Sequence, residues 1–204
     1  MIAPEETRFD LVRLGPADAG EVLTLQRAAY VTEAAAHDDL ALPPLVQTLA
    51  ELREELADGD VLAVGLRAAG RLVASVRVRV DGDVGHLGRL VVVPDLQRRG
   101  LGTRLLLAVE SVVPPGTRRI LLFTGERSLG NLTLYRGHGY LETHRTPVGG
   151  RGYRLVHLAK DLTGAGPGHP EEVAAVPTAA VEAVPAVPAP PAAGVRAAPP
   201  PATG

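Results

Sequence analysis

The stretch that decides the fold is LVVVPDLQRRGLGTRLLLAVE, residues Leu90–Glu110. Its apolar opening predicts a buried strand, which Pro94 ends. A basic, glycine-rich turn follows, and the apolar spacing after it predicts an amphipathic helix. A strand, a turn and a helix in this order direct several backbone N–H groups at one place, beside the positive end of the helix dipole. The stretch therefore predicts a binding site for an anion such as a diphosphate.

Regular elements are expected on both sides of this stretch, in the order β-α-α-β-β-β-α-β-α-β-β. The predicted strands cover Arg8–Leu14, Val61–Arg67, Leu72–Val80, Val84–Val93, Arg119–Thr124, Tyr140–Arg145 and Tyr153–Lys160. The predicted helices run from Gly15 to about Ala36, from Leu45 to Ala57, from Gly102 to about Val112 and from Ser128 to Arg136, and Pro43-Pro44 is expected to break the chain.

Two familiar phosphate loops do not fit the turn. The Walker loop needs Gly-Lys-Ser/Thr at its end, which is absent here. The dinucleotide fingerprint needs three glycines after the first strand of a βαβ unit, but Gly100-Leu101-Gly102 has no third glycine and follows hairpin-connected strands.

The turn instead resembles motif A of the GNAT superfamily of N-acetyltransferases, Q/R-x-x-G-x-G/A. Gln97-Arg98-Arg99-Gly100-Leu101-Gly102 matches every fixed position, and the resemblance covers about residues 8–160. It implies an α/β fold with a mixed, mostly antiparallel central sheet flanked by helices. It also implies acetyl-CoA as the acyl donor, with Arg98 to Thr103 around its pyrophosphate. The strand before the loop is expected to splay from its neighbour, so that Leu90, Val91 and Val92 offer backbone groups to the pantetheine arm.

A second motif of the same family is matched by Leu134-Tyr135 and Gly139-Tyr140 in SLGNLTLYRGHGYLE, Ser128–Glu142. The resemblance assigns to Tyr135 the role of proton donor to the departing CoA thiolate. A Tyr that only packs its ring in the core is the structural alternative. Asn131 lies four residues before Tyr135, on the same helix face, and is favoured as a contact to the cofactor arm over Ser128, which is equally suited to an N-cap.

The general base is left open by the sequence. Many family members carry a Glu on the motif A strand at the position of Gly88 here. His86 shares a strand face with Gly88, and its imidazole titrates near neutrality, although an exposed strand histidine is the plainer interpretation. Glu33 and the pair Asp38-Asp39 come at the end of the first helix, where they are placed either to hold a cationic amine or to solvate a helix end.

Composition excludes several functions. The 204 residues hold no Cys, which excludes disulfides, thiolate metal ligands and a Cys nucleophile, and no metal is expected. The formal net charge of −2 provides no field for nucleic acid or an anionic membrane. The opening MIAPEETRFD does not resemble a secretory signal, and no apolar run approaches the ~20 residues of a membrane span, so the cytoplasm is the expected location.

Two regions are expected along the chain: a domain over residues 1–162 and an Ala/Pro-rich tail over residues 163–204. The stretch from Gly164 to Gly204 holds ten of the 18 prolines and has no helical or strand period, which predicts an extended, disordered segment. A linker is the plain interpretation and a docking peptide the alternative.

The leading functional prediction is an N-acetyltransferase that carries acetyl from acetyl-CoA to a primary amine by direct attack in a ternary complex. The absence of Cys agrees with direct transfer. The missing Glu at Gly88 keeps open a non-catalytic acyl-CoA-binding module, and a nucleotide-binding α/β protein is a weaker alternative. The sequence does not identify the acceptor, a small-molecule or peptide amine, and it leaves a homodimer open.

Overall fold

The computed structural model describes residues 8–163, and the predicted Ala/Pro-rich tail lies outside the described residues apart from its first position. The elements follow the predicted order. They are β1 (Asp10–Arg13), η1 (Pro16–Asp18), α1 (Ala19–His37), α2 (Pro43–Val46), α3 (Leu49–Ala57), β2 (Val61–Ala68), β3 (Arg71–Asp81), β4 (Val84–Val92), η2 (Pro94–Leu96), α4 (Leu101–Val112), β5 (Arg119–Gly125), α5 (Leu129–Gly137), β6 (Leu141–Pro147) and β7 (Arg154–Asp161).

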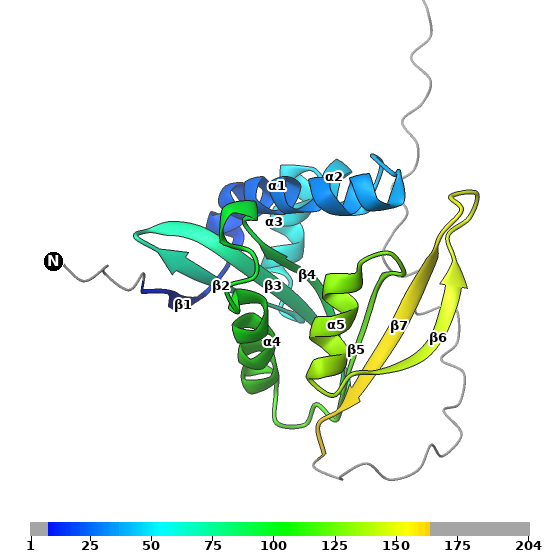
Figure 1. Ribbon diagram of the computed structural model, residues 1–204. Helices are drawn as coiled ribbons and strands as arrows, with labels where there is room; N and C mark the ends of the chain where they lie inside the picture. The colour runs from blue at the N-terminus through cyan, green and yellow to red at the C-terminus, as the bar shows by residue number, and fades with distance from the viewer. Residues whose placement is uncertain (1–7, 164–204) are drawn as a thin grey trace, which may run out of the picture. The chain divides into compact units, whose positions relative to one another are not determined.

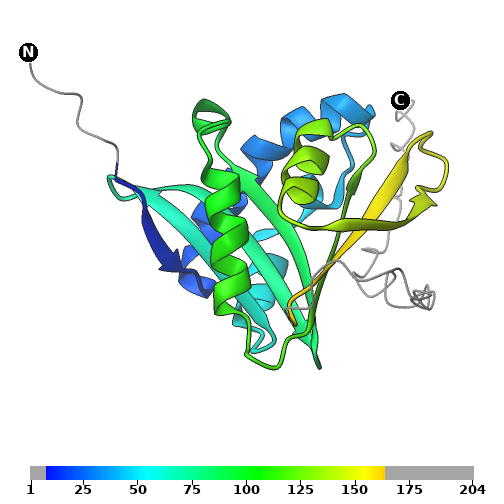
Figure 2. The same ribbon diagram turned by 60° about the horizontal axis from the view of Figure 1, so that its bottom comes forward.

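One seven-stranded sheet in the order β1-β2-β3-β4-β5-β7-β6 organises these elements. Every neighbouring pair is antiparallel except β4 and β5, which are parallel, so the predicted mixed, mostly antiparallel sheet is confirmed. Helices α1 and α3 lie on one face of the sheet, and α4 and α5 lie on the other (Figure 1). Figure 2 shows α4, in green, crossing in front of the strands with α1, in blue, behind them.

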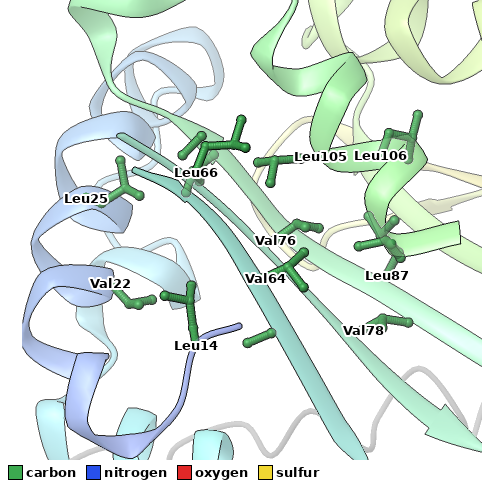
Figure 3. Close-up of a cluster of buried hydrophobic side chains, with 14 of the residues drawn as sticks. Leu14, Val22, Leu25, Val64, Leu66, Val76, Val78, Leu87, Leu105 and Leu106 are labelled. Carbon is green, nitrogen blue, oxygen red and sulfur yellow. The ribbon is translucent and has the colours of Figure 1, made fainter. Parts of the chain in front are cut away.

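The hydrophobic core lies on both faces of the sheet because the central strands are covered by helices on each side. Residues of β3 alternate, so that Val76 and Val78 face α4 while Arg77, between them, bonds to Gln26 of α1 and Glu55 of α3. Leu105 and Leu106 of α4 are fully buried against this face (Figure 3). Replacing either leucine by Ala would cost about 2–5 kcal/mol, and α4 is therefore held firmly where its N-terminus meets the end of β4.

Strands β4 and β5 part after a short pairing. They pair only over Val84–His86 and Arg119–Leu121. Beyond that point β4 continues on β3 as far as Val92, and β5 continues on β7 as far as Gly125. The splay expected from the family resemblance is thus present, and α5 lies in front of the two strands where they part (Figure 1).

The predicted helix from Leu45 to Ala57 is wrong at its start. Residues Pro43–Val46 form a short separate helix, α2, because proline is well suited to a first helical turn, and so the two prolines open a helix where a break was expected. The second helix starts after Thr48, whose hydroxyl accepts the Glu51 backbone N–H at 3.2 Å while the Glu51 carboxylate accepts the Thr48 N–H at 2.7 Å. This capping box separates α2 from α3.

Candidate active site

The predicted anion loop connects η2 to α4, and its backbone is turned to suit an anion. Gly100 precedes the helix with φ +80°, and Arg98 also has a positive φ, of 61°. No side chain caps α4, and its first hydrogen bond runs from Arg104 N–H to the Gly100 carbonyl at 3.0 Å. The N–H groups of the three preceding positions therefore have no intrahelical acceptor.

Those three positions are Leu101, Gly102 and Thr103, all within the predicted binding set. The Leu101 side chain is buried in the core, so Leu101 offers only its backbone to a ligand. The side chains of Gln97, Arg98 and Arg99 are exposed around the turn. The loop thus presents open N–H groups and two guanidinium groups together, an arrangement that fits a diphosphate.

The turn before the loop is anchored by an ion pair. Arg71, at the start of β3, donates to both carboxylate oxygens of Asp95, at 3.0 and 3.2 Å. The Arg71 hydrogen bonds hold the pKa of Asp95 below its ordinary value. The Gln97 side chain donates to the Val92 carbonyl at 3.3 Å, which ties the loop to the end of β4.

Where β4 leaves β5, its peptide groups point alternately to β3 and to the splay between β4 and β5. Val93 N–H donates to the Val73 carbonyl at 2.9 Å, so its peptide group points to β3. By the two-residue alternation the peptide groups of Val92 and Leu90 point to the splay, and those of Val91 point to β3. Of the three predicted strand contacts, Leu90 and Val92 therefore lie where an extended ligand would pair.

Gly102 borders the splay between β4 and β5. A Cβ there would lie 3.4 Å from Leu134 Cδ2 and 3.7 Å from Leu90 Cδ2. The first turn of α4, the end of β4 and α5 therefore meet at this point. Leu134 was part of the second family motif in the sequence but was not predicted to be a site residue.

Tyr135 lies on α5, with 5% of its surface exposed. Its ring packs against that of Tyr140, with centroids 5.8 Å apart. No described residue forms a hydrogen bond with the Tyr135 hydroxyl. Burial chiefly raises the pKa of Tyr135 well above its usual range, with smaller contributions from Tyr30 and Glu33 of α1. The phenol is therefore protonated at neutral pH.

Glu33 connects α1 to the start of α5. Its carboxylate accepts a hydrogen bond from the Ser128 hydroxyl, and the Ser128 side chain makes no capping bond to α5. Asn131 lies one turn before Tyr135, and its side-chain amide is 3.4 Å from the Thr124 hydroxyl. Ser128 is thus occupied by Glu33, whereas Asn131 has only a long contact and stays the better candidate for a ligand.

The other acidic candidates differ in their surroundings. Asp39 is buried and bonded to Arg151 and to the Tyr153 hydroxyl, the latter at 3.0 Å. Burial alone would raise its pKa, but the bonds from Arg151, the Ala41 N–H and Tyr153 hold the pKa below its ordinary value. Asp38 is exposed at the left-handed end of α1. Asp39 therefore fastens the end of α1 to the start of β7.

His86 lies on the sheet face that β3 turns to α1 and α3, because it pairs with Arg79 while Gly88 pairs with Arg77. Burial lowers the pKa of His86, so the imidazole is neutral at pH 7. A Cβ at Gly88 would meet no atom within 4 Å. The position where many family members carry a Glu is thus open space in this protein.

Comparisons with known proteins agree with this geometry. The family profile described as "Acetyltransferase (GNAT) domain" matches residues 31–162. The chain belongs to the GNAT superfamily of acetyltransferases. The crystal structure of the ribosomal-protein-S18-alanine N-acetyltransferase from Escherichia coli is similar to this acetyltransferase, with a TM-score of 0.64 and 19% identity over 79% of this chain and 99% of that chain.

Two further relatives bear on this GNAT protein. The S-(2-succino)cysteine N-acetyltransferase of Bacillus subtilis (strain 168) is 26% identical over 162 residues, which are 71% of this chain and 91% of that protein. The PaiA N-acetyltransferase of Thermoplasma acidophilum, solved in complex with coenzyme A, has a TM-score of 0.61 at 16% identity over 76% of this chain and 99% of that chain. The fold, the family and its acetyl-CoA-dependent N-acetyltransferase class are thus established.

Within residues 8–163, no three or more His, Cys, Asp or Glu side chains are grouped to hold a metal ion. In the same part of the chain, no helix combines the length and the apolar composition needed to cross a membrane.

Proposed function

We propose that this GNAT acetyltransferase transfers the acetyl group of acetyl-CoA directly to a small primary amine, with Tyr135 as proton donor to the leaving thiolate. The observation that carries the proposal is a protonated phenol, without a hydrogen-bond partner among the described residues, on the helix whose N-cap residue, Ser128, donates to the Glu33 carboxylate. A donor and an acceptor of protons are needed on the two sides of a thioester that an amine attacks.

The donor substrate would be held by the elements around α4. Gln97 to Thr103 would surround the pyrophosphate, with the open N–H groups of α4 and the Arg98 and Arg99 side chains as ligands. The pantetheine arm would pair with the peptide groups of Leu90 and Val92, and Asn131 would contact the arm from α5. These assignments rest on the helix N-terminus, the alternation of β4 and the family motif.

The number of protons that the amine loses and the thiolate gains sets the roles proposed for Glu33 and Tyr135. An ammonium acceptor loses one proton before its nitrogen attacks the carbonyl and a second as the amide forms, and the thiolate takes up one proton when the C–S bond breaks. We assign the binding and first deprotonation of the ammonium to Glu33 and the protonation of the sulfur to Tyr135, whose phenolate then takes up the second proton of the nitrogen. Since Gly88 carries no carboxylate, Glu33 would replace the strand Glu of other family members.

The test measures free thiol release from acetyl-CoA in a panel of amines. The panel contains amino acids, amino acid amides, a polyamine and S-(2-succino)cysteine, which is the acceptor in the name of the Bacillus subtilis relative. We expect Glu33→Gln to lower turnover by about 10²-fold or more while keeping a hydrogen-bond acceptor for Ser128. Asp38→Asn is the matched control, an acid-to-amide change at an exposed site of the same helix end. Equal activities of the two variants would remove Glu33 from the mechanism.

A further inference from the structure

A buried arginine lies beside the open space at Gly88. Arg77 of β3 is 3% exposed and pairs directly with Gly88 in the register of β3 and β4. One terminal nitrogen of its guanidinium donates to the Glu55 carboxylate at 3.0 Å, and the other donates to the Gln26 side-chain oxygen. Its Nε is buried and makes no hydrogen bond within residues 8–163. A buried donor without an acceptor is costly, so this nitrogen calls for an explanation.

The space at Gly88 lies on the same side of the sheet as Arg77. Residues directly opposite each other in an antiparallel pair point to the same face, and Arg77 contacts α1 and α3 on that face. A Cβ built on Gly88 meets no atom within 4 Å. A small group of a ligand therefore has room there, on the face of the sheet that carries Arg77.

A second cation follows immediately in β4. Arg89 has φ +54° in a bulge where Arg89 and Leu90 together oppose Val76. Its side chain is half-buried, and no described residue forms a hydrogen bond or an ion pair with it. A non-glycine residue with this φ is strained by about 1 kcal/mol, a cost that is common at binding sites.

The charges around this point do not balance. Burial, together with the nearby positive charge of Arg89 and against the opposing effect of Glu55, lowers the pKa of Arg77 to about 10. Glu55 is the carboxylate paired with Arg77, which leaves the charge of Arg89 without a partner in the described part of the chain. Tyr30 of α1 perturbs the pKa of both Arg77 and Tyr135, so these two side chains both lie near Tyr30.

We propose that the acceptor amine carries a carboxylate, which binds beside Gly88 between Arg89 and the free Nε of Arg77. The acceptor would then be amino-acid-like, with its ammonium toward Glu33 and its carboxylate toward the bulge of β4. Guanidinium–carboxylate bonds are strong and directional, and a ligand anion would satisfy both the orphan donor and the unpaired cation. The inference rests on the proposed function, because it describes the acceptor of that same site.

The first test compares matched acceptors, each amino acid of the panel with its α-carboxamide. We expect kcat/KM to be higher for the acids, and Arg89→Gln to lower it about 10- to 100-fold for the acids only. The amides should keep their kcat/KM, and the Kd for coenzyme A should not change. Arg53→Gln, at an exposed position on α3, is the matched control and should alter none of these quantities.

The second test fills the open space at Gly88 with a side chain of the protein. Gly88 has an ordinary φ and room for a side chain, so Gly88→Glu should fold and place a carboxylate where that of the acceptor would bind. We expect this variant to lose activity on the acids and to keep it on the amides. In direct titrations, the coenzyme A complex of Arg89→Gln should bind the acids, but not the amides, more weakly than that of the wild type.

The outcomes separate the two proposals. Equal kcat/KM for acids and amides, or an equal loss on both in Arg89→Gln, overturns the carboxylate site and leaves the proposed function standing. Weaker coenzyme A binding by Arg89→Gln also overturns it, since Arg89 would then serve the donor. Acetylation of no amine in the panel refutes the proposed function itself.

Discussion

Replacing Tyr135 by Phe removes one oxygen atom from a buried ring and tests the proposed proton donor directly. The ring keeps its contact with Tyr140, 5.8 Å away between centroids, so the packing of α5 should not change. No described residue hydrogen-bonds to the lost hydroxyl, so we expect the free energy of unfolding to change by less than about 0.5 kcal/mol. Turnover should fall about 10²–10⁴-fold, which corresponds to about 2.7–5.5 kcal/mol of transition-state stabilisation.

Tyr140 is a matched control in the same protein. Its hydroxyl donates to Glu110 at 3.2 Å, and that carboxylate keeps its bond to Lys160 at 2.7 Å when the phenol is removed. Tyr140→Phe should therefore cost about 1 kcal/mol, or roughly 2–4 °C in Tm for a domain of this size, with turnover unchanged. The two changes remove the same atom, and opposite effects on stability and turnover are expected.

The assay should follow single turnovers, because slow product release would hide a chemical defect. Thiol release is measured with enzyme in excess over acetyl-CoA, and the Kd for acetyl-CoA is measured by titration, where no change is expected. Burial raises the pKa of Tyr135, so wild-type turnover should show no loss from ionisation of this phenol up to about pH 10. Wild-type single-turnover rates in Tyr135→Phe would refute the assignment and leave water as the proton source.

Three further predictions concern the loop, the end of α1 and the extent of the domain. Gly100→Val should weaken coenzyme A binding about tenfold, because the φ of +80° costs a substituted residue about 1–2 kcal/mol, whereas Gly116→Val, with an ordinary φ and open space, should not. Asp39→Asn should lower Tm at pH 7. The pKa of Asp39 is lower in the folded protein than in the unfolded chain, where it is about 3.9, so ionised Asp39 stabilises the fold at a pH above the unfolded-state pKa. This stabilisation is lost as the pH falls through the folded-state pKa. Parallel curves of Tm against pH for the wild type and Asp39→Asn would contradict this. A chain ended at Thr163 should bind coenzyme A as the full chain does, because β1 to β7 all lie before it, and a weaker Kd would refute the proposed domain boundary.

Local signals in the sequence predicted most of the elements. The hairpin between β2 and β3 is an example, since Ala69 and Gly70 both take a positive φ, as a tight turn of this kind requires. The predicted start of α3 was wrong because the apolar periodicity begins at Leu45. Periodicity alone gives no information about capping, and the structure has Thr48 and Glu51 capping the helix three residues later. The capping box itself was visible in the sequence as Thr-x-x-Glu.

The residues of the candidate site differ in how far the sequence points to them. The anion loop and Tyr135 follow from contiguous motifs, whose chemistry depends on residues close in sequence. Arg77 was missed because strand alternation places an arginine in solvent by default, and its burial depends on Gln26 and Glu55, which are 51 and 22 residues away. Arg89 carries no sequence signal, since its bulge exists only in the register between β3 and β4.

The sequence by itself determined the order of the elements, the glycine-rich anion loop and the family, because each depends on periodicity, turn chemistry or a contiguous motif. Only the tertiary structure decided how the proposed acceptor side is built. Glu33 meets Ser128 across 95 residues, and that meeting requires β4 and β5 to part so that α1 and α5 approach each other from opposite faces of the sheet. Strand register and helix packing are long-range properties of the folded chain, and they alone pair Arg77 with Gly88 and bring Glu33 to Ser128.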